Sequence, residues 1–208
     1  MKRIGLTQRV DFINHYKEKR DALDQNWYPF CFKIDCIPVP LPNLKKNIDN
    51  YFKSLKIDVL LLSGGNSISL PNKNISDSAP ERDNFEFKLI KFGIKNNIPI
   101  IGVCRGMQIL NMFFGGQIKK IKNHVNANHK LYLNSDEYDL PKFVNSYHAW
   151  SIPKNNLANK FYPVAFDKNG NVECFVSKNR KILGLMWHPE RDKVCNEKNI
   201  NLLKKIIK

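Results

Sequence analysis

The sequence predicts a three-layer α/β/α fold with a mostly parallel central sheet. Short apolar runs of strand length alternate with longer segments in which apolar side chains recur at helical spacing, as in successive strand–helix units. Two of these runs, 57–62 and 98–103, are almost wholly apolar, which is typical of strands buried on both faces. The 208 residues suffice for one continuous core, so we expect a single domain over residues 1–208.

The first half of the chain is expected to supply the parallel strands and the helices between them. Prolines flank the second strand and indicate an edge position, because proline cannot donate to a central ladder. In the second predicted helix, four apolar residues fall on one helical face. The predicted strands are residues 2–6, 36–40, 57–62 and 98–103, and the predicted helices are residues 20–32, 43–55 and 81–96.

After Gly116 the pattern changes to short strands separated by turns, and a last amphipathic helix follows them. The strands predicted here are residues 129–133, 142–147, 162–166, 172–176 and 182–187, and the helix is 197–207.

Composition and charge narrow the class of protein. A hydrophobic fraction of 42% is typical of a folded soluble chain. The net charge of +15 could indicate nucleic acid, a membrane surface or an anionic small substrate. The lysines are scattered among asparagines and isoleucines and no nucleic-acid module is recognisable, so we interpret the charge first as compositional and next as a sign of an anionic substrate. We expect no nucleic-acid partner.

We also expect a cytoplasmic protein without a membrane partner. The basic N-terminus lacks the apolar segment of a signal peptide, and the longest apolar runs are far shorter than a membrane span. The sequence does not indicate an oligomeric state.

The cysteines and histidines show no spacing typical of a disulfide framework or a metal site. Five cysteines are an odd number without a C-x-x-C pair, which favours reduced thiols. No histidine pair stands at i, i+4 with a third ligand, so we expect no metal. A phosphate-binding G-x-x-x-x-G-K-[ST] loop is also missing, and we expect no cofactor and no ATP-driven synthesis in this chain. The histidines considered are His15, His124, His129 and His148.

Cys104 stands between the predicted strand 98–103 and a following helix, in the run Gly102-Val103-Cys104-Arg105-Gly106. This is the arrangement of a nucleophile elbow with cysteine in place of serine. The glycines on either side allow a strained, tightly packed turn. The N-terminal dipole of the following helix would stabilise a thiolate. The structural alternative is an ordinary buried cysteine at a strand end.

Ser63-Gly64-Gly65-Asn66 follows the other strongly apolar strand. The carboxyl ends of parallel strands meet at one sheet edge, so the N–H groups of this turn are expected beside the elbow. Together with the N–H of Arg105, one of these glycines could form an oxyanion hole. Taken alone, two glycines are more typical of a simple turn.

His188 and Glu190 end the last predicted strand, in Trp187-His188-Pro189-Glu190. A histidine can take the thiol proton and return it to a leaving group, while a carboxylate on its other nitrogen holds the tautomer. An isolated histidine is more often structural. Combined with an elbow cysteine, a catalytic role is favoured.

Gly102 to Gln108 together with Trp187 to Glu190 resemble the class I glutamine amidotransferase family, and the order of the motifs matches along nearly the whole chain. The resemblance implies a flavodoxin-like fold with short antiparallel strands added to the parallel sheet. A finer resemblance is to the free-standing, peptidase C26-like γ-glutamyl hydrolases, whose members cleave γ-glutamyl amides. It is carried by Pro80-Glu81-Arg82-Asp83 with Phe85-Glu86, by Asn145-Ser146-Tyr147-His148 and by Asn171-Val172-Glu173.

The resemblance implies roles for individual residues. Cys104 would be the nucleophile, His188 the general base and acid, and Glu190 the residue that orients His188. The amides of Gly65 and Arg105 would bind the oxyanion. Contacts with the glutamyl part of the substrate are implied for Gly64, Gln108, Ser146, Tyr147 and His148.

The leaving group is less well defined by the resemblance. Asn66 stands where an acidic residue is common, and Ala149-Trp150 also departs from the usual pattern. The polar segment after strand one is interpreted as a solvated loop and helix face or, alternatively, as part of a leaving-group pocket built from Arg9, Glu18 or Arg20.

The expected reaction is hydrolysis of a γ-glutamyl amide through a thioester on Cys104, releasing glutamate and an amine or phosphoramidate. Candidate substrates are γ-glutamyl-γ-aminobutyrate and the nucleotide-linked γ-glutamyl-CDP-amidate of capsule phosphoramidate biosynthesis. A glutaminase subunit that delivers ammonia to a separate synthase would share the same catalytic residues, although Arg105 and the Arg82-Asp83 pair favour the hydrolase. A second alternative is a non-catalytic binding protein of the same fold.

Overall fold

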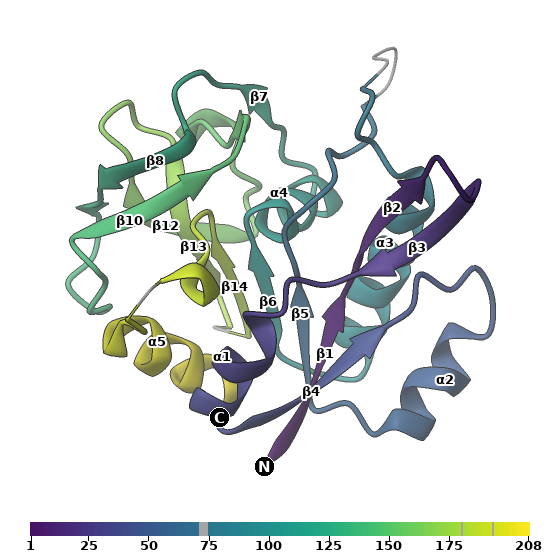
Figure 1. The fold of residues 1–208 in the computed structure, drawn as a ribbon. Coiled ribbons are helices and arrows are strands. Elements are labelled where there is room, and N and C mark those ends of the chain that lie inside the picture. Colours follow the sequence, from purple (N-terminus) through teal and green to yellow (C-terminus); the bar gives the residue numbers. More distant parts are fainter. Residues whose placement is uncertain (71–74, 180, 193) are drawn as a thin grey trace.

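The computed structural model describes residues 1–70, 75–179, 181–192 and 194–208. Its centre is an eight-stranded sheet in the order β4-β1-β5-β6-β14-β13-β12-β9 (Figure 1). Neighbours from β4 to β14 run parallel, and the remaining pairs are antiparallel. The strands are β1 (Lys2–Thr7), β4 (Cys36–Leu41), β5 (Val59–Leu62), β6 (Ile100–Val103), β9 (Tyr132–Leu133), β12 (Phe161–Phe166), β13 (Val172–Ser177) and β14 (Ile182–Leu185).

Helices cover both faces of the sheet, which confirms the predicted three-layer α/β/α architecture. Helices α1 (Trp27–Lys33) and α5 (Glu197–Ile207) share one core with Val59 and Leu61 of β5. Leu60 and Leu62 of the same strand face the other core, because successive strand side chains point to opposite faces. That second core is closed by α2 (Ile48–Leu55), α3 (Pro80–Lys95) and α4 (Arg105–Phe113).

The parallel strands agree with the sequence, and β4 is at an edge as its prolines predicted. The predicted helix 43–55 begins later, at Ile48, because Asn47 has the left-handed φ of 58° and cannot continue a helix backwards. Helix α3 begins with Pro80 and has acidic residues in its first turn, both of which suit a helix N-terminus.

The predicted helix 20–32 is wrong in its first part. Residues 9–13 and 18–22 form an antiparallel hairpin of β2 (Arg9–Ile13) and β3 (Glu18–Ala22), and α1 begins only at Trp27. The solvated loop expected after strand one is therefore this hairpin. Cross-strand hydrogen bonding satisfies its backbone. The helical spacing that we assigned to this segment holds only from Trp27 onward, where Phe30 shares the buried face.

The second half adds small strand pairs beside the sheet. They are β8 (Val125–Lys130) with β10 (Phe143–Tyr147) and β7 (Lys119–Lys120) with β11 (Trp150–Ser151), and two short helices follow, η1 (Lys154–Asn156) and η2 (Pro189–Arg191). The predicted strand 129–133 is divided between β8 and β9. The last helix has the bounds that the sequence predicted.

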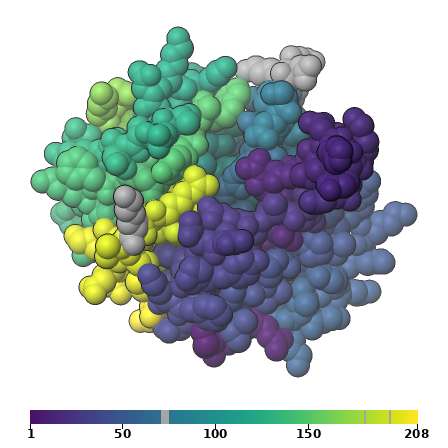
Figure 2. Space-filling model, viewed as in Figure 1, coloured from purple at the N-terminus to yellow at the C-terminus, as the bar shows by residue number. Residues whose placement is uncertain are grey.

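The helices in the described ranges are all too short or too polar to cross a bilayer. On the face shown in Figure 2, the green β8/β10 region and the purple β2/β3 hairpin stand on either side of a hollow, with the yellow C-terminal segment at its lower border.

Candidate active site

Cys104 sits at the turn between β6 and α4 with a strained backbone, φ 52° and ψ −106°. The flanking glycines explain how this turn packs. A Cβ on Gly102 would overlap the carbonyl of Gly106, and a Cβ on Gly106 would overlap the carbonyl of Leu62 in β5. Only glycine allows the two strands and the helix to approach this closely. The geometry is that of the predicted nucleophile elbow.

His188 follows β14, and Cys104 follows β6. Because these two strands pair in parallel, their carboxyl ends bring His188 next to Cys104. Nδ1 of His188 lies 2.6 Å from Oε1 of Glu190, and both side chains are buried. The side chains of Cys104 and His188 are hydrogen-bonded to each other. The structure thus brings the three predicted catalytic residues together in the order thiol, imidazole, carboxylate.

The electrostatics around His188 favour its charged form. Burial by itself lowers the pKa of His188, but the negative charges of Cys104 and Glu190 outweigh burial and raise it to about 10. An imidazolium at neutral pH is the natural partner of a thiolate, and it holds a proton ready for a leaving group.

The other four cysteines lack this environment. Burial raises the pKa of Cys31 to about 12 and that of Cys36 to about 11, and it also raises the pKa values of Cys174 and Cys195. All five thiols are free. Burial thus disfavours the thiolate form of these four cysteines.

Asn145 holds the backbone of His188, a role that the sequence did not indicate. Its Oδ1 accepts from the His188 N–H at 2.9 Å, and its Nδ2 donates to the His188 carbonyl at 2.8 Å. The same Nδ2 reaches Asp192 Oδ1 at 3.0 Å. Asn145 comes from β10, so this clamp joins two segments about forty residues apart that no local pattern links.

The Gly64-Gly65 turn follows β5 and lies against His188. A Cβ on Gly64 would stand 2.5 Å from Cε1 of the His188 ring, and Gly65 has the left-handed φ of 90°. Arg82 of α3 fixes this turn from below by donating to the carbonyls of Ser63 at 2.8 Å and Gly64 at 3.0 Å. These two hydrogen bonds hold the turn in place beside His188.

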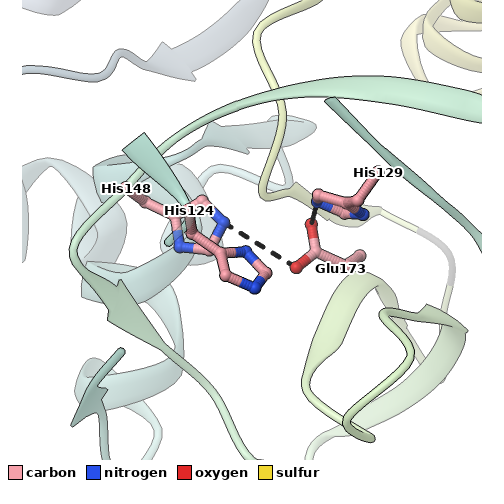
Figure 3. A group of neighbouring side chains, drawn as sticks. All are labelled: His124, His129, His148 and Glu173. Carbon is pink, nitrogen blue, oxygen red and sulfur yellow. Dashed lines mark ion pairs between the residues drawn. The ribbon is translucent and has the colours of Figure 1, made fainter. Parts of the chain in front are cut away.

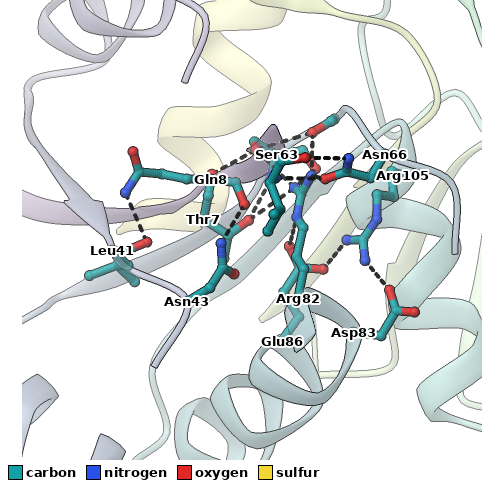
Figure 4. A network of polar contacts seen from close by, with 12 residues as sticks. Thr7, Gln8, Leu41, Asn43, Ser63, Asn66, Arg82, Asp83, Glu86 and Arg105 are labelled. Carbon is teal, nitrogen blue, oxygen red and sulfur yellow. Dashed lines mark hydrogen bonds and ion pairs between the residues drawn. The ribbon is translucent and has the colours of Figure 1, made fainter. Parts of the chain in front are cut away.

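Arg82 belongs to a buried ion cluster that it forms with Asp83, Glu86 and Arg105 (Figure 4). Glu86 binds both arginines, while Asp83 binds Arg105. Burial raises the pKa of Glu86, but the two arginines outweigh burial and hold it below its usual value. The guanidinium of Arg105 is engaged here, so its backbone N–H, in the unpaired first turn of α4, is the group left for an oxyanion.

Two neighbouring cavities border this constellation. One, of about 230 Å³, is lined by Cys104 and by Gln108, Tyr147 and His148. The other, of about 280 Å³, lies on the side of His188 and Glu190. Arg9 and Gly65 line both cavities. The second cavity is also lined by Asp11, Ala22, Leu23, Asp24, Trp27, Ser63, Gly64 and Arg191.

Of the other predicted site residues, Gln108 and Tyr147 line the cavity of Cys104, whereas Ser146 lies outside both cavities. Gln108 donates to the Trp150 carbonyl at 2.9 Å, and the Tyr147 ring meets the His188 ring edge-on at 5.8 Å. The Ser146 hydroxyl is buried and donates to the His124 carbonyl at 2.6 Å, and Ser146 does not line either cavity. Of the three side chains suggested for a leaving-group pocket, Arg9 lines it, whereas Glu18 and Arg20 pair with each other on the exposed hairpin.

A second polar cluster lies behind His148. Among the described residues, His124, His129, His148 and Glu173 form a group that could hold a metal ion, although their spacing in the sequence gave no such indication.

Comparisons with known proteins show a family and a fold. Residues 4–190 match the family model described as Peptidase C26. The chain is 33% identical to a gamma-glutamyl-CDP-amidate hydrolase of Campylobacter jejuni, over 97% of this chain and 95% of that protein. It is 30% identical to the glutamine amidotransferase-like protein YvdE of Lactococcus lactis, over 70% of each. Among solved structures, a glutamine amidotransferase of Thermotoga maritima superposes with a TM-score of 0.67 at 18% identity, covering 98% of this chain and 83% of that one.

Proposed function

The chain belongs to the peptidase C26 family, and we propose that it is a γ-glutamyl amide hydrolase that works through a thioester on Cys104. The observation that carries the proposal is the hydrogen-bonded series from Cys104 through His188 to Glu190 at the border of two cavities. The near full-length similarity to a γ-glutamyl-CDP-amidate hydrolase supports a γ-glutamyl group as the acyl part of the substrate.

In the first half-reaction the Cys104 thiolate attacks the γ-carbonyl carbon of the substrate. A C–S bond forms, and the carbonyl oxygen becomes an oxyanion that accepts from the backbone N–H groups of Gly65 and Arg105. The charged His188 then donates its proton to the departing nitrogen. The C–N bond breaks, and a glutamyl thioester is left on Cys104.

In the second half-reaction water replaces the amine. His188, now neutral, takes a proton from water as the oxygen attacks the thioester carbon. Collapse of the second tetrahedral intermediate breaks the C–S bond, releases glutamate and restores the thiolate–imidazolium pair. Glu190 keeps Nδ1 of His188 protonated throughout, so that Nε2 faces the reacting atoms.

The two cavities suggest how the substrate is divided. The glutamyl part would occupy the cavity of Gln108, Tyr147 and His148, and the leaving group would occupy the cavity on the His188 side. Arg9 and Arg191 line that second cavity beside the carboxylates of Asp11 at 2.7 Å and Asp24 at 3.5 Å, and a phosphate would bind the guanidinium N–H groups that these pairs leave over. We therefore propose a nucleotide-linked γ-glutamyl phosphoramidate as the substrate class, ahead of γ-glutamyl-γ-aminobutyrate.

The test is glutamate release from glutamine, γ-glutamyl-γ-aminobutyrate and γ-glutamyl-CDP-amidate, measured for the wild type and for Cys104→Ala. We expect turnover of the phosphoramidate by the wild type alone, and a glutamyl adduct on Cys104 by mass spectrometry of the quenched reaction. Equal turnover by both proteins would contradict covalent catalysis at Cys104.

The alternatives give different results in the same assay. A glutaminase subunit would release glutamate from glutamine only when a synthase is added. A non-catalytic binding protein would bind a γ-glutamyl compound without turnover in either form. Substitution of Arg9 by alanine, with Arg20→Ala as a matched control on the exposed hairpin, should slow the phosphoramidate reaction selectively if Arg9 contacts the phosphate.

A further inference from the structure

Three histidines and a glutamate converge in the second half of the molecule (Figure 3), and one of them, His148, also lines the cavity of Cys104. His129 is on β8, Glu173 is on β13, and His124 and His148 stand beside β8 and β10. One ligand atom from each residue lies within 4.8 Å of all the others. We call these four residues the histidine cluster.

The atoms that face one another in the histidine cluster lack hydrogen-bond partners. Nε2 of His129, Nε2 of His148 and both carboxylate oxygens of Glu173 are buried without a hydrogen bond within the described part of the chain, and their contacts with one another are ion pairs only where an imidazole is protonated. The contacts between them are 3.5 Å from His129 to Glu173 and 3.8 Å from His148 to Glu173. A buried carboxylate with both oxygens unpaired is costly, and so many orphaned acceptors rarely meet by chance.

Backbone carbonyls determine which ring nitrogens point into the cluster. Nδ1 of His148 lies 2.9 Å from the Trp150 carbonyl, and Nδ1 of His129 lies 3.4 Å from the Lys130 carbonyl. A carbonyl can only accept, so Nδ1 of His148 carries the proton and its Nε2 is left with a lone pair on the side of Glu173, while the longer contact of His129 turns its Nε2 toward the same carboxyl group. This is the arrangement that metal-binding histidines adopt.

A second carboxylate stands beside the cluster. Oδ2 of Asp167 lies 3.5 Å from Nε2 of His124. Asp167 is itself held in place by the backbone N–H groups of Asn169 at 2.8 Å and Asn171 at 2.9 Å. Glu173 and Asp167 thus place two carboxyl groups beside three imidazoles, a set of oxygen and nitrogen donors that a divalent cation can bind.

We propose that the histidine cluster binds one Zn²⁺ ion, with His124, His129, His148 and Glu173 as its ligands. Imidazole nitrogens with a carboxylate oxygen are a donor set suited to zinc. Tetrahedral zinc places its ligand atoms about 3.3 to 3.6 Å apart, so ligand atoms that lie within 4.8 Å of one another would close by roughly 1 Å around the ion. Four protein ligands close the coordination sphere, and the site is structural rather than catalytic.

The position of the site indicates what the ion does. It ties the β8/β10 pair to β13 of the main sheet through His129 and Glu173. It also anchors His148, whose segment lines the cavity of Cys104, and the Trp150 carbonyl that accepts from His148 also accepts from Gln108. The ion would thus hold one wall of the substrate cavity.

The experiment measures zinc in the purified full-length chain by elemental mass spectrometry, after zinc loading and removal of free metal. We expect about one equivalent per chain for the wild type and less than about 0.2 equivalent for Glu173→Gln and His129→Ala. His15→Ala is the matched control, because His15 is exposed on the hairpin turn and lies outside the cluster, and it should keep the full equivalent. Cys104→Ala should also keep it, which separates this site from the proposed hydrolysis.

A measurement on the wild-type chain tests the site even if the variants fail to fold. Chelation should lower the Tm of the wild type by at least about 5 °C, and added Zn²⁺ should restore it. Cobalt loading should give the visible absorption of a tetrahedral Co²⁺ centre with nitrogen and oxygen ligands. Substoichiometric zinc in the wild type, a Tm unaffected by chelator and zinc, or zinc retained in Glu173→Gln would each overturn the proposal.

Discussion

Two buried polar clusters lie near Cys104, and their buried charges are compensated in different ways. In the ion cluster, Glu86 binds Arg82 and Arg105, and Arg82 also saturates two carbonyls of the glycine turn. In the histidine cluster, Glu173 faces His129 and His148 without a hydrogen bond on either oxygen. Because buried charges need partners, the opposite charges of the first cluster compensate one another within the chain, although Nε of Arg105 has no hydrogen bond, whereas the second cluster is completed by a cation.

Both clusters support the site from outside the reacting atoms. The ion cluster fixes the Gly64-Gly65 turn and the start of α4, and the histidine cluster lies behind the cavity wall of His148. The comparison therefore predicts that damage to either cluster changes stability and positioning, while damage to Cys104 changes chemistry alone.

The largest expected effect is that of Cys104→Ala. Loss of the nucleophile should reduce γ-glutamyl hydrolysis by at least about 10⁴-fold, because the thioester cannot form. The Tm should stay within a few degrees of the wild type, since the side chain is small and both clusters are untouched. Turnover and calorimetry on the same preparation check both parts, and a large loss of stability would mean that Cys104 is also structural.

Glu86→Gln tests the ion cluster. It leaves two buried arginines with one carboxylate fewer, and we expect a loss of roughly 3 to 5 kcal/mol in the free energy of unfolding. Glu81→Gln is the matched control on the same helix, because its pair with Lys19 is largely exposed on the lysine side and should contribute less than about 1 kcal/mol. Denaturant unfolding measures both variants, and equal losses would remove the distinction between the clusters.

Asn145→Ala tests the clamp on His188. Loss of its two hydrogen bonds to the His188 backbone should lower kcat by about 10- to 100-fold with a smaller change in KM, because the proton donor is displaced while the substrate cavity is kept. Steady-state kinetics check this split. A change confined to KM would place Asn145 in substrate binding instead.

The smallest expected effect concerns the protonation of His188. The pKa of His188 is raised above its ordinary value, so its contribution to stability is fully present below about pH 6.5 and is lost as the pH rises through about 10. Cys104→Ala removes a negative charge that raises this pKa, so the pKa should fall and the loss should be complete at a lower pH. A titration of the His188 ring by NMR in both proteins gives the direction. An unchanged pKa would mean that Glu190 alone sets it.

The sequence by itself determined the layered fold and the catalytic candidates, because both depend on local patterns. Buried strands, helical faces and the glycines around Cys104 are readable from neighbouring residues, and so is the short spacing from His188 to Glu190. The pattern failed at residues 20–22, where cross-strand pairing with residues 9–11 decides the conformation. That pairing is invisible in a single segment.

The tertiary structure alone decided which distant polar side chains meet. Asn145 reaches His188 because β10 folds over the end of β14, and Arg82 reaches the glycine turn from a separate helix. The histidine cluster is the clearest case, since His124 and His129 stand at β8, His148 follows β10 and Glu173 comes from the central sheet. Spacing along the chain carries no information about such a site, because strand pairing and sheet order bring its ligands together.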